Sequence, residues 1–130
     1  MGTGYKGGAS HYHSLGENLS ELKKFYDFNE KTGYFGDPGN GGSTKTRHIV
    51  SADPDTAARD FYNKASYGGI QKNIPNGKGV YTIMRDGSVI TYRKTSNSDG
   101  SPVVNIHISS TNPEAGNIKT QKIHFIKEKL

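Results

Sequence analysis

The chain has 130 residues, which is enough for one domain with a single hydrophobic core. Lys and Arg outnumber Asp and Glu, 17 against 12, and this excess favours polyanionic partners, either nucleic acid or an acidic protein. The absence of cysteine excludes disulfide scaffolds and cysteine-ligated zinc sites, and no apolar run approaches the length of a membrane span.

Residues 1–14 are expected to form a flexible, glycine-rich lead-in to a single domain over residues 15–130. The opening run MGTGYKGG has the composition of a linker and is typical of a segment cut from within a longer protein. His11 and His13 lie in this lead-in, and we expect them to be exposed rather than to bind a metal.

Two helices are predicted in the first half of the domain. Over residues 15–28, leucines and aromatic residues recur at helical spacing and form one apolar stripe. Residues 29–44 are rich in glycine and are expected to form a long loop. The second helix is predicted to follow a cap at Ser51 or Asp53, to have Pro54 in its first turn and to end at the next double glycine.

Four strands are predicted to follow as an antiparallel meander, over residues 80–85, 88–94, 103–109 and from residue 118 onward. The pair Asp86-Gly87 separates the first two runs and is the strongest short-range signal of a two-residue hairpin turn. Such a turn sets three pairs opposite one another: Ile83 with Ile90, Tyr81 with Tyr92, and Thr82 with Thr91.

Side chains alternate across a strand, so one face of this sheet is predicted to cover a core and the other to be polar. The fold class is therefore α+β, with N-terminal helices packed on the apolar face of a four-stranded antiparallel sheet. The polar face carries no Asp or Glu, although an ordinary solvated face mixes both signs. It gathers Thr91, Arg93, Asn105, His107, Lys122 and His124.

Three segments carry candidate chemistry. The first contains His48, whose side chain titrates near neutrality and can act as a general acid or base; alternatively it packs on a helix or lies in solvent. The second is the loop after Arg93, where hydroxyls and backbone N–H groups can hold a phosphate; alternatively it is only a polar turn. Its candidates are Thr95, Ser96, Ser98 and Ser101.

The polar sheet face is the third candidate. His107 and His124, on adjacent strands, can form an acid/base pair for RNA cleavage, one removing the 2′-hydroxyl proton and the other protonating the 5′-oxygen. A cation such as Lys122 stabilises the phosphorane, and no metal or other cofactor is required. Asn105 is expected to bind substrate on the same face. The alternative is an ordinary solvated sheet face.

Three runs of the chain resemble the C-terminal toxin domains of bacterial polymorphic toxins: RHIVSADPDTAARDFYNKASYGG, NGKGVYTIMRDGSVITYRKTSNSDGSPVVNIHI and IKTQKIHF. The resemblance covers residues 45–127 and is to domains carried by LXG secreted toxins and CdiA-type contact-dependent inhibition proteins. Such domains are similar to the barnase–EndoU–colicin–RelE nuclease superfamily, in which N-terminal helices pack on a twisted antiparallel sheet. A fold like that of the microbial ribonucleases and RelE is therefore implied.

The resemblance also implies the function of a metal-independent RNA endonuclease, with tRNA as one candidate substrate. The domain would be secreted as part of a larger toxin and would act in the cytoplasm of a rival bacterium. A cognate immunity protein would neutralise the toxin in the cell that produces it. We expect that protein to be acidic because it must cover a basic face. No membrane partner is expected.

The residues that match the recurrent polar positions of the family are implied to form the site. His48 or His124 would be the acid or base, Arg93 with Lys78 or Lys122 would stabilise the phosphorane, and Thr95 and Ser96 would hold the scissile phosphate. The implied catalytic set is His48, Lys78, Arg93, Thr95, Ser96 and His124. The expected substrate-binding set is Ser98, Asn105, His107 and Lys122.

Two other functions stay open. A DNase toxin of the same delivery class would need a divalent metal held by carboxylates and histidines, and few carboxylates lie near the histidines in the sequence. A non-catalytic nucleic-acid-binding module would bind RNA with a steep salt dependence and leave it intact.

Overall fold

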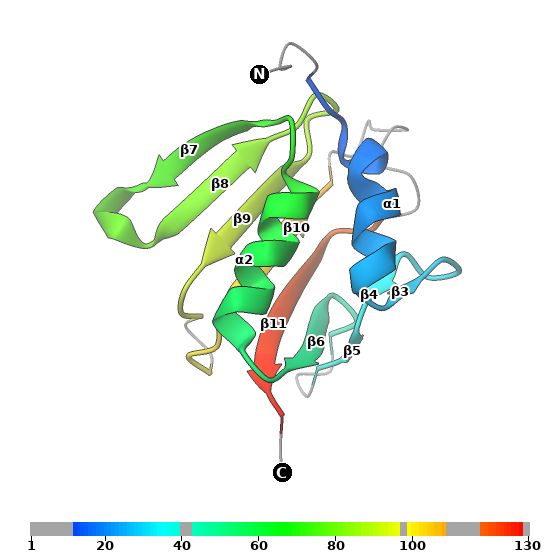
Figure 1. The fold of residues 1–130 in the computed structure, drawn as a ribbon, viewed down its shortest axis with the longest axis vertical. Coiled ribbons are helices and arrows are strands. Elements are labelled where there is room, and N and C mark those ends of the chain that lie inside the picture. Colours follow the sequence, from blue (N-terminus) through cyan, green and yellow to red (C-terminus); the bar gives the residue numbers. More distant parts are fainter. Residues whose placement is uncertain (1–11, 40–42, 97–98, 109–117, 129–130) are drawn as a thin grey trace.

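The computed structural model describes residues 12–39, 43–96, 99–108 and 118–128. Within these residues, two helices lie on one face of a seven-stranded sheet, and a short two-stranded sheet flanks them (Figure 1). The predicted α+β class is confirmed. The predicted number of strands in the sheet is wrong, since seven are present instead of four.

The main sheet has the strand order β5–β6–β11–β10–β9–β8–β7. Strands β6 and β11 are parallel, and the other neighbouring pairs are antiparallel. A short 3₁₀ helix, η1 (Pro75–Gly77), joins β7 to β8, and the small sheet pairs β3 (Phe28–Asn29) with β4 (Tyr34–Phe35). The main-sheet strands are Asp37–Pro38 (β5), Thr46–Ser51 (β6), Ile70–Ile74 (β7), Gly79–Ile83 (β8), Val89–Arg93 (β9), Val103–His107 (β10) and Gln121–Lys127 (β11).

Both helices begin at strong N-caps. Helix α1 (Leu15–Phe25) starts with a capping box between Ser14 and Glu17, and it ends three residues before the predicted boundary because Tyr26 is extended. Helix α2 (Pro54–Ala65) is capped by Asp53, one of the two predicted candidates. Neither helix of the described residues is long and apolar enough to cross a membrane.

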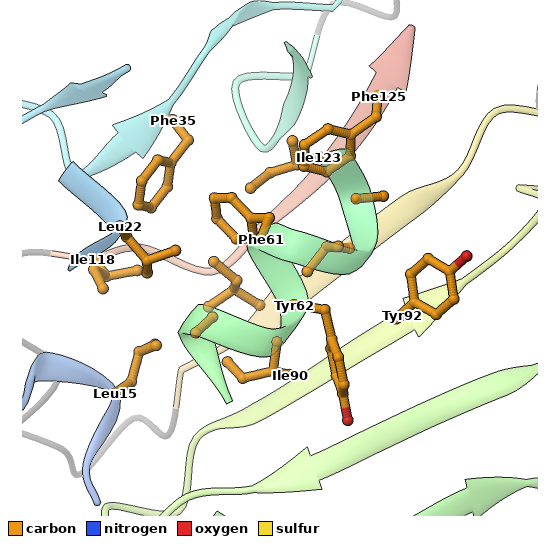
Figure 2. Close-up of a cluster of buried hydrophobic side chains, with 14 of the residues drawn as sticks. Leu15, Leu22, Phe35, Phe61, Tyr62, Ile90, Tyr92, Ile118, Ile123 and Phe125 are labelled. Carbon is orange, nitrogen blue, oxygen red and sulfur yellow. The ribbon is translucent and has the colours of Figure 1, made fainter. Parts of the chain in front are cut away.

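The core lies between the helices and one face of the sheet (Figure 2). Phe61 projects from α2 into an aromatic cluster, with ring centroids 4.9 Å from Phe35, 5.0 Å from Tyr26 and 5.7 Å from Phe125. Edge-on contacts of this kind add to the hydrophobic gain from burying each ring. The helix layer is thereby fixed to β11 and β4, and the opposite face of the main sheet keeps its polar side chains.

Strands β5, β6 and β7 were not predicted. The run at β6 does not show apolar alternation, because its core-facing residue Arg47 is a buried cation. The guanidinium of Arg47 donates to the carbonyl oxygens of Phe35, Thr44 and Gly36, so hydrogen bonds take the place of apolar packing. Strand β7 is an exposed edge strand, and β5 lies within the predicted loop over residues 29–44.

The hairpin between β8 and β9 differs from the prediction by one residue. Ile83 pairs with Val89, and Thr82 pairs with Ile90. Since side chains alternate, this shift moves every side chain of β8 to the opposite face of the sheet. The three predicted pairs, Ile83 with Ile90, Tyr81 with Tyr92 and Thr82 with Thr91, are therefore wrong.

The cause of the shift is a turn of three residues instead of two. The N–H of Met84 donates to the carbonyl oxygen of Ser88 at 2.8 Å, and Gly87 adopts a φ of 84°. A glycine in the left-handed region is typical of three-residue hairpin loops. The carboxylate of Asp86 then accepts from the N–H of Ser88 and closes the turn.

Thr82 consequently faces the helices. It is 1% exposed, and its hydroxyl forms a short hydrogen bond with the hydroxyl of Tyr62 on α2. Tyr81 and Ile83 lie on the polar face, where the prediction had placed Thr82.

Thr82→Val is expected to lower the free energy of unfolding by about 1–3 kcal/mol, because the buried Tyr62 hydroxyl loses its Thr82 partner. Thr91→Val is the matched control, since it makes the same change on the polar face; we expect an effect below about 0.5 kcal/mol. Urea unfolding measures both values. Equally small effects would contradict the observed register and favour the predicted one, in which both threonines share the polar face.

Candidate active site

Two histidines lie side by side on the polar face. The parallel register of β6 and β11 makes His48 the direct neighbour of His124, and their ring centroids are 5.8 Å apart with an interplanar angle of 79°. His124 is 3% exposed, whereas His48 is half-buried. The expected pairing of His107 with His124 is wrong: His124 lies opposite Val103 on β10, and His107 is roughly 13 Å further along that strand.

The loop between β9 and β10 folds against His124. Ser101 Oγ lies 2.8 Å from Nδ1 of His124, and Asp99 Oδ1 lies 3.3 Å from the same nitrogen. The carboxylate of Asp99 also accepts from Ser101 Oγ at 2.6 Å, from Ser101 N at 3.0 Å and from Ser96 Oγ at 2.6 Å. One carboxylate oxygen therefore organises both serines and the imidazole.

These contacts fix the protonation of the imidazole. Burial alone would raise the pKa of Asp99, but the hydrogen bonds from Ser101 and Ser96 outweigh it, so that the pKa is held well below its usual range. An ionised carboxylate only accepts, and hence the Ser101 hydroxyl proton points at Asp99. Ser101 Oγ then offers only a lone pair to His124, and Nδ1 must carry the proton. In the neutral ring, the lone pair lies on Nε2.

The charge state of His124 follows from its surroundings. Burial is the main cause that lowers its pKa, and the positive charges of Lys122 and His48 lower it further, whereas Asp99 raises it. The net direction is downward, so His124 is neutral at pH 7. Positive charge on His48 therefore favours the neutral form of His124.

A cationic pocket of about 440 Å³ lies beside this cluster. It is lined by Gly77 and Lys78 at the end of η1 and by the residues where β9 runs into its loop. Cations and hydroxyls together are the groups that bind phosphate. The pocket brings together four of the implied catalytic residues and one cation that was not predicted, Lys94. Its lining residues are Gly77, Lys78, Arg93, Lys94, Thr95 and Ser96.

Ser96 connects the pocket to the histidine pair. It lines the pocket, is 6% exposed, and donates to the carboxylate that touches His124. Arg93 and His124 both lie opposite Val103, one on each side, so their backbones are about 10 Å apart across two strand spacings. Arg93 and His124 thus lie on the same face, separated by the width of strand β10.

The remaining predicted residues lie in a second row of the same face. Thr91, Asn105 and Lys122 are consecutive cross-strand partners on β9, β10 and β11, as the alternation predicted. His107 is exposed and lies two residues further along β10 than Asn105, opposite Val89 on β9. Ser98 lies outside the described residues.

Neither Asp99 nor Ser101 was predicted to contact a histidine, and Ser101 was expected only among the hydroxyls that can hold a phosphate. The run Asp99-Gly100-Ser101 has the composition of an ordinary turn, and nothing local marks it as a partner of a histidine 23 positions away from the serine. The polar face is also not free of acidic residues, because Asp37 on β5 lies opposite His48. Among the described residues, no group of three or more metal-ligating side chains occurs.

Comparison with known proteins gives no match: no family model, no curated protein and no solved structure is similar to the chain.

The neutral imidazole of His124 is expected to carry its proton on Nδ1 and to titrate below the ordinary histidine range. Asp99→Asn is expected to lower that pKa further, because it removes the negative charge that favours the imidazolium. Long-range ¹H–¹⁵N NMR of ¹⁵N-histidine-labelled protein, recorded as a pH titration, reports both the tautomer and the pKa.

Asp27→Asn is the matched control, since it removes an exposed carboxylate away from the loop and should leave His124 unchanged. A proton on Nε2, or a higher pKa in Asp99→Asn, would show that Asp99 and Ser101 do not set the state of this ring.

Proposed function

We propose that the protein is a metal-independent RNA endonuclease whose proton transfers are carried out by His48 and His124. The observation that carries this proposal is the paired imidazoles on a sheet face next to a pocket lined by Lys78, Arg93 and Lys94. Two imidazoles of opposite protonation, with cations beside them, are sufficient for transesterification of RNA.

The reaction begins at the 2′-hydroxyl of the substrate. Nε2 of neutral His124 accepts the 2′-hydroxyl proton as the 2′-oxygen forms a bond to phosphorus, and protonated His48 gives a proton to the 5′-oxygen as the phosphorus–O5′ bond breaks. The products are a 2′,3′-cyclic phosphate and a free 5′-hydroxyl. Because His124 is 3% exposed, it meets the substrate through one edge, while half-buried His48 offers the larger surface.

The cationic pocket supplies the electrostatic part of catalysis. Charge on the phosphoryl oxygens increases in the phosphorane, and preorganised cations stabilise that state more than the starting diester. Lys78 and Arg93 come from different elements, η1–β8 and β9, and meet at this pocket. Thr95 adds a hydroxyl to the same pocket.

The assignment to polymorphic toxins of the barnase–EndoU–colicin–RelE type, and delivery into a rival bacterium, rest on the sequence resemblance. The layering of helices on one sheet face, with the histidine pair on the other, is consistent with that superfamily. An acidic immunity protein that covers Arg93 and Lys78 would associate fast at low salt, because opposite charges steer the encounter.

The purified chain is expected to degrade RNA in the presence of EDTA. His48→Ala and His124→Ala should each lower the rate by about 10²–10⁴-fold, the range for removal of a general acid or base. Arg93→Ala and Lys78→Ala remove phosphorane stabilisation and should each cost about 10²–10³-fold. Initial rates on a fluorescent oligoribonucleotide, followed by mass analysis of the termini, measure the rate and the cyclic phosphate.

Lys31→Ala is the control for the loss of one positive charge, because Lys31 lies away from the pocket, beside the small sheet. Undiminished cleavage of RNA by both histidine variants would rule out proton transfer by His48 and His124. Cleavage of DNA that depends on added Mg²⁺ would replace it with the DNase function, and salt-sensitive binding of RNA without cleavage would indicate a binding module.

A further inference from the structure

A second pocket, of about 400 Å³, lies between α2 and strands β7, β8 and β9. Its volume is within the range of about 300–1,000 Å³ in which small-molecule sites fall. It adjoins the cationic pocket, because Gly77 and Lys94 line both. A Cβ atom added at Gly77 would have no atom within 4 Å, so the space beside this shared residue is open.

The floor of this second pocket is aromatic, and its hydroxyl groups are hydrogen-bonded. Tyr62 and Tyr92 are 3% and 7% exposed, and their ring centroids are 6.1 Å apart. Each hydroxyl is already engaged, that of Tyr62 with Thr82 and that of Tyr92 with Asp55. The small part of these side chains that reaches the pocket is therefore apolar ring edge, since neither hydroxyl is free to turn toward a ligand.

The rim carries groups suited to the edge of a base. Asn63 and Gln71 are exposed and present amides at the pocket, and Arg59 lies over the ring of Tyr92 with its guanidinium carbon 6.0 Å from the centroid. The Tyr62 hydroxyl donates to Oε1 of Gln71 at 3.3 Å, which leaves the Gln71 NH₂ group to donate to a ligand. Amide side chains pair with base edges in this manner.

The charge of the pocket favours a nucleotide. None of the residues that line it, within the described part of the chain, is acidic. Lys94 and Arg59 are cationic, and Arg59 also pairs with Asp55, whose Oδ2 lies 3.1 Å from its Nε. A phosphate in the neighbouring pocket would place the attached base within reach of the aromatic floor, since Lys94 belongs to both pockets.

We propose that this pocket binds the nucleobase of the RNA nucleotide whose phosphate lies in the adjacent cationic pocket. The inference rests on the proposed function, because it takes the phosphate to belong to RNA. It adds that cleavage is selective for the base at one position, and that Gln71 and Asn63 determine which base is accepted.

The test is an NMR titration of the full chain with inorganic phosphate and with each of the four nucleoside 3′-monophosphates. Phosphate is expected to shift the resonances of residues 93–96 alone. At least one nucleotide should bind about tenfold more tightly than phosphate and also shift the side-chain amides of Asn63 and Gln71. Gln71→Ala and Asn63→Ala should weaken that nucleotide several-fold and leave the affinity for phosphate unchanged.

Asn73→Ala is the matched control, because Asn73 is an exposed amide on the same strand and side as Gln71 but does not line the pocket. Equal affinities for phosphate and all four nucleotides, or no binding of any nucleotide, would overturn the inference. A protein that binds one nucleotide selectively but leaves RNA intact would contradict the proposed nuclease function and leave the base-binding pocket supported.

Discussion

The candidate site depends on the parallel pairing of β6 with β11, because this pairing sets His48 beside His124. On the helix-facing side, two buried polar side chains hold the strands together. The side chain of Gln121 on β11 accepts from the N–H of Phe35 and donates to the carbonyl oxygen of Gly33. Arg47 on β6 donates to the carbonyl oxygen of Phe35. Breaking such buried bonds costs about 1–3 kcal/mol each. A polar network under the sheet thus fixes two imidazoles above it.

The loop over residues 94–102 adds the second constraint. Its carboxylate, Asp99, is held ionised by the serines around it, and it holds His124 in one tautomer in turn. The same loop begins with residues that line the cationic pocket, so one segment positions both parts of the site. A shift of this loop would move the residues that line the cationic pocket and change the surroundings of the imidazole together, since buried Ser96 lines the pocket and donates to Asp99.

Strands β9, β10 and β11 could be predicted from the sequence, because they follow one another along the chain and their side chains alternate between the two faces. Thr91 and Lys122 flank Asn105 as expected. Strand β8 could not be predicted in register, since Asp86-Gly87 suits both a two-residue turn and a three-residue turn with glycine left-handed. The position of His48 beside His124 could not be predicted either. Its strand β6 pairs with β11, which lies near the other end of the chain, and no local pattern specifies such a partner.

The properties that suit His124 to proton transfer also make the fold sensitive to acid. Burial, Lys122 and His48 lower its pKa in the folded state, so the unfolded chain binds a proton more readily. The contribution of His124 to the free energy of unfolding is complete above the ordinary histidine pKa. It is lost as the pH falls through the lower pKa that His124 has in the folded protein. Asp99 acts in the same direction at lower pH, because its pKa is also lowered by folding. The burial that keeps the imidazole of His124 neutral therefore also makes its protonation oppose folding.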